Sequence, residues 1–378
     1  MKILVIQASG VGCMIMATPA LRYIRRQCPQ AEIDLLVTQP SFALPVRDGD
    51  LVKRVFLLPV AKEHPWRSIV GSLWRVWRLR RQRYDLTITL FPSRKPHFAL
   101  LSLAINAITR VGHEYAGISR LGQAIWRLAY THRVMADLKR HDVEQNFALV
   151  QTVFPGGGPQ PGELEFSVPT TARATALAFV HHHRLDRHRP IGMHPGSSKE
   201  FGFAEKRWPI HSFAALAQKV IDDLQRPVLI FFGPDERDLR ERLEAIFSHE
   251  WLITVQEDLG VTAELIRGCE AFVSNDSGLM HLAAAMGIPM TIGLFGPTNA
   301  SRTHPWGCRH VVIQRAAPEE IFTYPFTEAK TDLGGQAQEL MTRIGVDEVY
   351  QALVHAIGHA AATLPCQPSE DSRPCPAG

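Results

Sequence analysis

The sequence predicts an α/β protein built from two successive units, each with a parallel sheet. Residues 1–150 alternate short apolar runs with helical patterns, and the same alternation resumes from Ile191 to about Leu353. This rhythm is typical of parallel strands joined by helices. A Pro- and Gly-rich stretch, Phe154–Gly162, separates the two series and is the clearest linker in the chain.

The first unit contains four runs that we expect to be strands, namely Ile3–Ile6, Ile33–Val37, Arg54–Leu58 and Leu86–Leu90. Turn-forming residues between the helical and strand patterns mark the domain boundaries. We predict an N-terminal Rossmann-like domain over 1–155, a linker over 156–168, a C-terminal Rossmann-like domain over 169–361 and a disordered tail over 362–378. The tail is assigned on its content of Pro, Ser and charged residues.

One segment in the second unit carries most of the chemical information. The apolar run Ala271–Val273 stops at small polar residues, and an Ala-rich helical pattern follows. Asp276 or Ser277 is expected to cap this helix, and its free N–H groups would form a natural phosphate site. His281 shares a helix face with Ser277, four residues earlier. The alternative is an ordinary capped helix with a surface histidine.

A second strand–helix junction offers hydroxyl groups and a cation. An apolar strand leads from Pro190 into the loop Gly196-Ser197-Ser198, and Lys206 precedes an amphipathic helix for which Pro209 is a suitable first residue. Small hydroxyls and a lysine suit a diphosphate. Because open α/β sheets bind ligands where polar residues and glycines gather at strand ends, both junctions are expected to border one site.

These segments together resemble glycosyltransferase family 9, the ADP-heptose:lipopolysaccharide heptosyltransferases. The resemblance rests on HPGSS, EKRWP, FFGPDER, VSNDSGLMHLAAAMGIP and LFGPT in this order, and on an amino terminus that reads MKILVIQ, GVGC and ATPAL. It runs from residue 1 to about residue 355. The D-S-G-x-x-H block is fairly specific, whereas the glycine-rich start alone would be weak because it does not match G-x-G-x-x-G.

The resemblance implies the GT-B fold, in which two Rossmann-like domains face a central cleft and close over donor and acceptor. It implies an inverting transfer of heptose from an ADP-sugar to a lipopolysaccharide core, without a metal or other cofactor because the donor site itself neutralises the diphosphate. The donor residues carried over are Ser197, Ser198 and Lys206 at the diphosphate, Asp276, Ser277, Gly278 and His281 at the rest of the donor, and Glu236 at the ribose hydroxyls.

The chain departs from the family pattern at Cys13. The family has an aspartate directly after the second glycine of its first loop, where it is taken as the catalytic base, but here Gly10-Val11-Gly12 precedes a cysteine. A carboxylate can accept the proton of the acceptor hydroxyl, whereas an ordinary thiol is mostly neutral at pH 7. Cys13 is therefore either a thiolate activated by a helix N-terminus or a small buried filler.

Three functions follow from this departure. The chain is an active transferase in which Cys13, or a carboxylate from elsewhere, replaces the base; or a catalytically impaired homologue that binds a nucleotide sugar or glycan; or an enzyme with another outcome, such as donor hydrolysis. We favour the first, because so complete a donor site is hard to reconcile with an absence of chemistry.

Charge is divided unevenly along the chain. Residues 1–150 hold 22 Lys and Arg against 10 Asp and Glu, whereas residues 151–378 hold 19 against 27. Tryptophans and arginines interleave over 66–83, a pattern that suits a membrane surface or an anionic glycolipid. The alternative is a partly exposed helix whose tryptophans pack on the N-terminal sheet. Nucleic-acid binding is disfavoured, because no nucleic-acid motif accompanies the charge. The residues assigned to the acceptor side are Gly10, Gly12, Arg67, Arg75 and Arg78.

Composition is that of a soluble globular protein, with 46% hydrophobic and 21% charged residues in 378. Apolar runs stay short of the roughly 18 residues needed to span a bilayer, and the start lacks a secretion signal. The six cysteines lack C-x-x-C spacing and resemble reduced cytosolic thiols. We therefore expect a cytoplasmic protein, with peripheral contact to the inner membrane face and no required oligomer. His181–His183 is expected to be a solvated helix face rather than a metal site.

Overall fold

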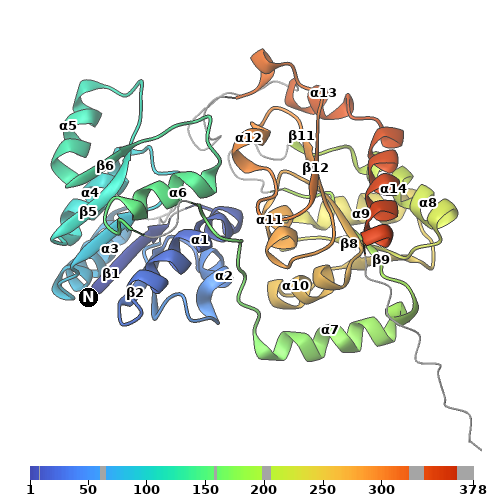
Figure 1. Cartoon of the computed structure of the whole chain (residues 1–378), viewed down its shortest axis with the longest axis horizontal. Helices are drawn as coiled ribbons and strands as arrows, with labels where there is room; N and C mark the ends of the chain where they lie inside the picture. Colours follow the sequence, from blue (N-terminus) through green and yellow to red (C-terminus); the bar gives the residue numbers. More distant parts are fainter. Residues whose placement is uncertain (8, 60–64, 157–159, 198–205, 323–335, 364–378) are drawn as a thin grey trace, which may run out of the picture.

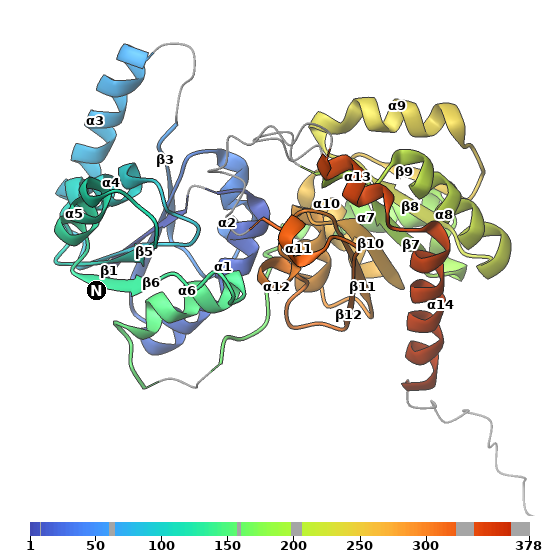
Figure 2. The same ribbon diagram turned by 90° about the horizontal axis from the view of Figure 1, so that it is seen from above.

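The computed structural model describes residues 1–7, 9–59, 65–156, 160–197, 206–322 and 336–363, and of residues 65–71, 186 and 359–363 it describes the backbone alone. Within these residues the chain forms two lobes, each a six-stranded parallel sheet flanked by helices (Figures 1 and 2). The α/β architecture expected from the sequence, with two Rossmann-like sheets of GT-B type, is confirmed.

The N-terminal lobe has the strand order β3-β2-β1-β4-β5-β6. Its strands are β1 (Lys2–Gln7), β2 (Glu32–Val37), β3 (Arg54–Leu57), β4 (Leu86–Thr89), β5 (Thr109–Glu114) and β6 (His132–Met135). Its helices are α1 (Val11–Gln27), α2 (Leu44–Arg47), α3 (Pro65–Arg81), α4 (Pro96–Ile105), α5 (Arg120–Ala129) and α6 (Asp142–Gln151). Ile3 pairs with Ile33 on one side and Leu86 on the other, so β1 is central and its apolar residues are buried on both faces.

The C-terminal lobe repeats this plan with the order β12-β11-β10-β7-β8-β9. Its strands are β7 (Ile191–His194), β8 (Val228–Phe231), β9 (Leu252–Val255), β10 (Ala271–Asn275), β11 (Thr291–Phe295) and β12 (His310–Gln314). Its helices are α7 (Thr170–His182), α8 (Ile210–Leu224), α9 (Arg237–Ile246), α10 (Leu259–Gly268), α11 (Gly278–Ala285), α12 (Ala300–Thr303), α13 (Gln336–Thr342) and α14 (Val346–Thr363).

Two local expectations need correction. Pro209 is not the first helical residue: it has extended backbone geometry and directly precedes α8, which begins at Ile210. Ser277 does occupy the position before α11, but its side chain makes no capping hydrogen bond, since its hydroxyl lies 3.0 Å from that of Ser274. The expected tail lies outside the described residues from residue 364 onward.

Both sheets reverse their strand order at the centre, between β1 and β4 in one lobe and between β7 and β10 in the other. Ligands of open α/β sheets bind at the carboxyl ends of strands beside such reversals. The carboxyl end of β1 leads into α1, and that of β10 leads into α11. These two strand ends therefore locate the candidate site.

The described part of the predicted linker lies along α1. The backbone N–H of Glu165 donates to the Thr18 hydroxyl at 2.9 Å, and its carboxylate accepts a 2.8 Å hydrogen bond from Arg22 Nε. Arg22 Nη1 also donates to Asp50 at 2.8 Å. These contacts hold the start of the crossing between lobes against the N-terminal lobe. None of the described helices is both long and apolar enough to cross a membrane.

Candidate functional site

The first turns of α1 and α11 meet at the boundary between the lobes, where the two helices lie side by side (Figures 1 and 2). A side chain at Gly12 would place its Cβ 2.9 Å from Cδ2 of His281 and 3.2 Å from Cα of Gly278. Neither helix start is capped by a side-chain hydrogen bond. Two positive helix ends therefore converge, an arrangement that favours a bound anion.

Lys206 and Asp276 form a buried ion pair beside these helix ends, with Nζ 2.9 Å from Oδ2. Burial alone would raise the pKa of Asp276, but the charge and hydrogen bond of Lys206 outweigh it and lower the pKa. Asp276 is thus ionised at neutral pH and holds the ammonium group in one place. The structure therefore brings a fixed cation to the meeting point of the helices.

Asn275, the last residue of β10, ties three segments of this site together. Its Nδ2 donates to the carbonyl of Pro195 at 2.8 Å, and its Oδ1 accepts a 2.9 Å hydrogen bond from the backbone N–H of Trp208. The Trp208 indole donates in turn to the carbonyl of Ile344 at 2.9 Å. The loop after β7 and the approach to α8 are therefore anchored to the strand that leads into α11.

Glu236 lies beneath the loop that follows β7. A Cβ at Gly196 would lie only 1.8 Å from Oε1 of Glu236, so a side chain at this position would displace the carboxylate. The other oxygen of Glu236 accepts a 2.7 Å hydrogen bond from the backbone N–H of Gly233. Ser197, which follows in the loop, accepts a hydrogen bond from Arg207 Nε at 3.2 Å. Contacts of Glu236 and Ser197 with a donor remain predictions, and Ser198 lies outside the described residues.

His281 is buried close to Gly12, and burial lowers its pKa to about 4. Its ring is therefore neutral at physiological pH. Among the described residues nothing hydrogen-bonds to its buried Nδ1. Because a buried polar atom without a partner is costly, this nitrogen is available to a ligand.

Cys13 is the third residue of α1 and is partly buried. Burial raises the pKa of its thiol to about 12, and the negative charge of Asp142 acts in the same direction. The expectation of a thiolate activated by a helix N-terminus is therefore wrong, because desolvation outweighs any lowering by the helix end. Cys13 is a neutral thiol at pH 7 and a poor proton acceptor.

Sequence analysis missed a second buried ion pair, which joins the two lobes. Arg302, in α12, donates to Oδ1 of Asp142, the first residue of α6, from Nη2 at 2.8 Å and from Nε at 3.1 Å. The Arg302 guanidinium also lies 5.2 Å from the centre of the Phe91 ring. Beside this pair, His141 Nε2 donates to the carbonyl of His304 at 2.9 Å. No sequence signal connects Asp142 with Arg302, because they are 160 residues apart.

The structure does not bring Arg75 and Arg78 to Cys13. Both belong to α3, which lies on the outer side of the N-terminal lobe, away from α11 (Figures 1 and 2). Trp74 and Trp77 on this helix are 55% and 50% exposed, so about half of each side chain is accessible to solvent. The side chains of Trp66 and Arg67 lie outside the described part.

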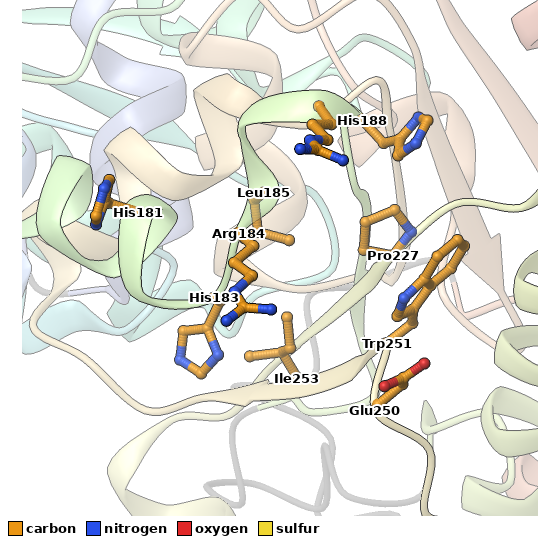
Figure 3. A pocket seen from close by; sticks show the side chains of 10 residues that line it. His181, His183, Arg184, Leu185, His188, Pro227, Glu250, Trp251 and Ile253 are labelled. Atoms are coloured by element: carbon orange, nitrogen blue, oxygen red, sulfur yellow. The ribbon is translucent and has the colours of Figure 1, made fainter.

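A cavity of about 690 Å³ lies apart from this site, at the amino ends of the strands in the C-terminal lobe. Figure 3 shows His183, Arg184, Trp251 and Ile253 around it. His181 and His183, which were expected on a solvated helix face, thus line this cavity together with Arg184 and Arg187. Of the residues that the structure describes, no group of three or more His, Cys, Asp or Glu is placed to hold a metal ion.

The packing at Gly12 predicts that Gly12→Ala prevents close contact of the lobes. The added methyl group overpacks against His281 and Gly278, at a cost of about 1–3 kcal/mol. We expect the radius of gyration from small-angle X-ray scattering to increase. Gly10→Ala is the matched control, since a Cβ there meets no atom within 4 Å. An unchanged radius for Gly12→Ala would contradict this packing.

The raised pKa of Cys13 predicts slow alkylation. At pH 8 its thiolate fraction should be lower than that of free cysteine by on the order of a thousandfold, because deprotonation requires a pH near 12. We expect labelling by iodoacetamide, followed by peptide mass spectrometry, to be correspondingly slow and to accelerate with pH. Labelling of Cys13 as fast as free cysteine would show that the thiol is activated.

Comparison with known proteins gives the family. Residues 71–323 match glycosyltransferase family 9 (heptosyltransferase). Lipooligosaccharide heptosyltransferase 2 of Haemophilus ducreyi is 30% identical over 331 residues, which cover 83% of this chain and 88% of that protein. Lipopolysaccharide heptosyltransferase 2 of Salmonella typhimurium is 30% identical over 329 residues, which again cover 83% of this chain and 88% of that protein.

Solved structures share the fold. The E. coli ADP-heptose lps heptosyltransferase II aligns with a TM-score of 0.71 and 24% identity over 96% of this chain and 100% of that one. A family 9 glycosyl transferase from Veillonella parvula aligns with a TM-score of 0.77 and 21% identity over 95% and 97% of the two chains. From the family match and the relatives that span most of its length, the chain belongs to glycosyltransferase family 9 and is a heptosyltransferase-type glycosyltransferase.

Proposed function

We propose that this chain transfers heptose from ADP-heptose to a lipopolysaccharide core acceptor, with inversion of the anomeric configuration and without a metal ion. The observation that carries the proposal is the convergence of the α1 and α11 N-termini beside the buried Lys206–Asp276 pair. Relatives that match over most of this chain are named lipopolysaccharide or lipooligosaccharide heptosyltransferases, which supports the choice of sugar and acceptor.

The donor diphosphate would lie against the two helix ends. Its negative charge is met there by backbone N–H groups and by the Lys206 ammonium, which Asp276 holds in position. The Nδ1 of His281, which has no hydrogen-bond partner within the described part of the chain, offers one further polar contact. Such fixed groups stabilise the charge that develops on ADP as it leaves, which is the task a metal ion has in other transferases.

Transfer would proceed by direct displacement. The acceptor hydroxyl attacks the anomeric carbon on the face opposite the diphosphate, and this geometry inverts the configuration. A two-step route would need an ionised nucleophile, and the neutral Cys13 thiol does not suit that role.

Helix α3 supplies a surface for the membrane in which a lipid-linked acceptor is anchored. Leu73 is 64% exposed beside the exposed tryptophans, and Arg78 and Arg81 lie over the rings of Trp74 and Trp77 at 4.8 and 4.7 Å. Apolar side chains ringed by guanidinium groups suit an anionic lipid surface. We therefore propose peripheral binding to the inner face of the cytoplasmic membrane.

The donor site predicts a large effect of Lys206→Ala. The native chain should release ADP from ADP-heptose only when a truncated, heptose-accepting lipopolysaccharide is present. Lys206→Ala should lower kcat/KM by about 10²–10³-fold, because charge on the leaving group loses its fixed cation. Lys219→Ala is the control, since that lysine pairs with Asp347 on the outer helix α14. No ADP release by the native chain, or equal rates for the two variants, would refute the donor assignment.

The surface of α3 predicts that Trp74→Ala/Trp77→Ala weakens binding to vesicles containing anionic phosphatidylglycerol. Loss of two large apolar groups should reduce the partition coefficient by about tenfold or more, as measured by vesicle sedimentation. Leu177→Ala/Ile246→Ala removes apolar side chains of similar exposure from the C-terminal lobe and serves as the control. Equal losses in the two double variants would exclude α3 as the docking surface.

A further inference from the structure

The ion pair between Asp142 and Arg302 is unusual in its position. It is almost completely buried, with 3% and 5% of the two residues exposed, and it joins α6 of one lobe to α12 of the other. Burial of two charges costs more solvation energy than an apolar contact of the same volume, so a pair of this kind is weak evidence for a stabilising role. The location of the carboxylate suggests what the pair does instead.

Two carboxylates act electrostatically on the Cys13 thiol, and Asp142 acts more strongly than Asp276. The two carboxylates differ in their hydrogen-bond partners. Asp276 is held by Lys206, which keeps its pKa low and makes it a weak base. Arg302 donates two hydrogen bonds to Oδ1 of Asp142, and among the described residues Oδ2 accepts only one, at 3.1 Å and also from Arg302, so Oδ2 retains a lone pair for a second donor. Asp142 begins α6, which packs against α1, the helix that carries Cys13.

We propose that Asp142 is the catalytic base of the transfer and performs the task that the family pattern assigns to the position of Cys13. The inference rests on the proposed function, because it requires an acceptor hydroxyl beside Cys13. Arg302 is a positioning residue: it donates two hydrogen bonds to Oδ1 and one to Oδ2, and its charge opposes protonation of the carboxylate.

The step balances without another reactant. The acceptor O–H bond breaks, and its proton passes to Asp142 Oδ2. The acceptor oxygen forms the new bond to the anomeric carbon, while the bond from that carbon to the diphosphate oxygen breaks. ADP leaves with the electron pair, next to Lys206 and the helix ends. Asp142 then returns the proton to solvent when the lobes separate.

Two properties of Asp142 support this role. Burial raises its pKa, although the charge of Arg302 opposes the increase, so the ionised form has a greater affinity for a proton than an ordinary aspartate. Moreover, the carboxylate comes from one lobe and its orienting guanidinium from the other. The base is therefore assembled only when the lobes are in contact, which restricts proton abstraction to the closed enzyme.

Steady-state kinetics of the full chain with ADP-heptose and truncated lipopolysaccharide test the proposal. Asp142→Asn should lower kcat by about 100-fold or more, the contribution of a general base, and leave the dissociation constant of ADP within about threefold. The acidic limb of the kcat/KM profile should disappear. Asp137→Asn, which changes an exposed carboxylate five residues away, should have native kinetics.

A rescue variant separates a base from a mere connection between lobes. Cys13→Asp/Asp142→Asn returns a carboxylate to position 13. Its kcat should be at least tenfold higher than that of Asp142→Asn. Arg302→Met, which removes the positioning group, should also lower kcat, and Cys13→Asp should restore it, because a base at position 13 does not depend on Arg302. Near-native kcat for Asp142→Asn, or losses that Cys13→Asp does not restore, would overturn the role of Asp142 and leave the proposed function intact. Absence of acceptor-dependent ADP release by the native chain would overturn both.

Discussion

The contact between the first turns of α1 and α11 is the constraint on which the rest of the site depends. Each helix starts directly after a central strand of its sheet, so the contact sets the reversal points of the two sheets against each other. The absence of a side chain at Gly12 allows the backbones to approach this closely, since a Cβ there would lie 2.9 Å from the His281 ring and 3.2 Å from Cα of Gly278. Two further segments, the loop after β7 and the approach to α8, are anchored to the end of β10 through Asn275.

The electrostatics of the site follow from pairing rather than from net charge. Lys206 with Asp276, and Arg302 with Asp142, are two buried pairs of zero net charge, while Cys13 and His281 are neutral. The remaining positive electrostatic potential comes from the N-termini of α1 and α11. Their backbone dipoles attract an anion without a further charged side chain. Buried pairs contribute little to folding stability, and the proposed roles of Lys206 and Asp142 would give a reason for their presence here.

Sequence patterns correctly predicted those elements that depend on residues close together in the chain. Apolar runs ending in polar residues located β1 and β10, and the D-S-G-x-x-H block placed Asp276 and His281 at the start of one helix. Burial of Cys13 could not be predicted, because it depends on packing against the other lobe. The pair of Asp142 with Arg302 has the same origin, since its partners meet only after two sheets have formed and closed. The start of α8 differed by one residue, as helix ends depend on tertiary contacts.

The tight approach at Gly12 also limits how such an enzyme can diversify. A mutation that adds a side chain at Gly12 would push the two helix starts apart, so a substitution at this position is not a route to new substrates. Changes in acceptor preference should therefore accumulate in segments outside this helix junction, which separates adaptable recognition from a tightly packed centre.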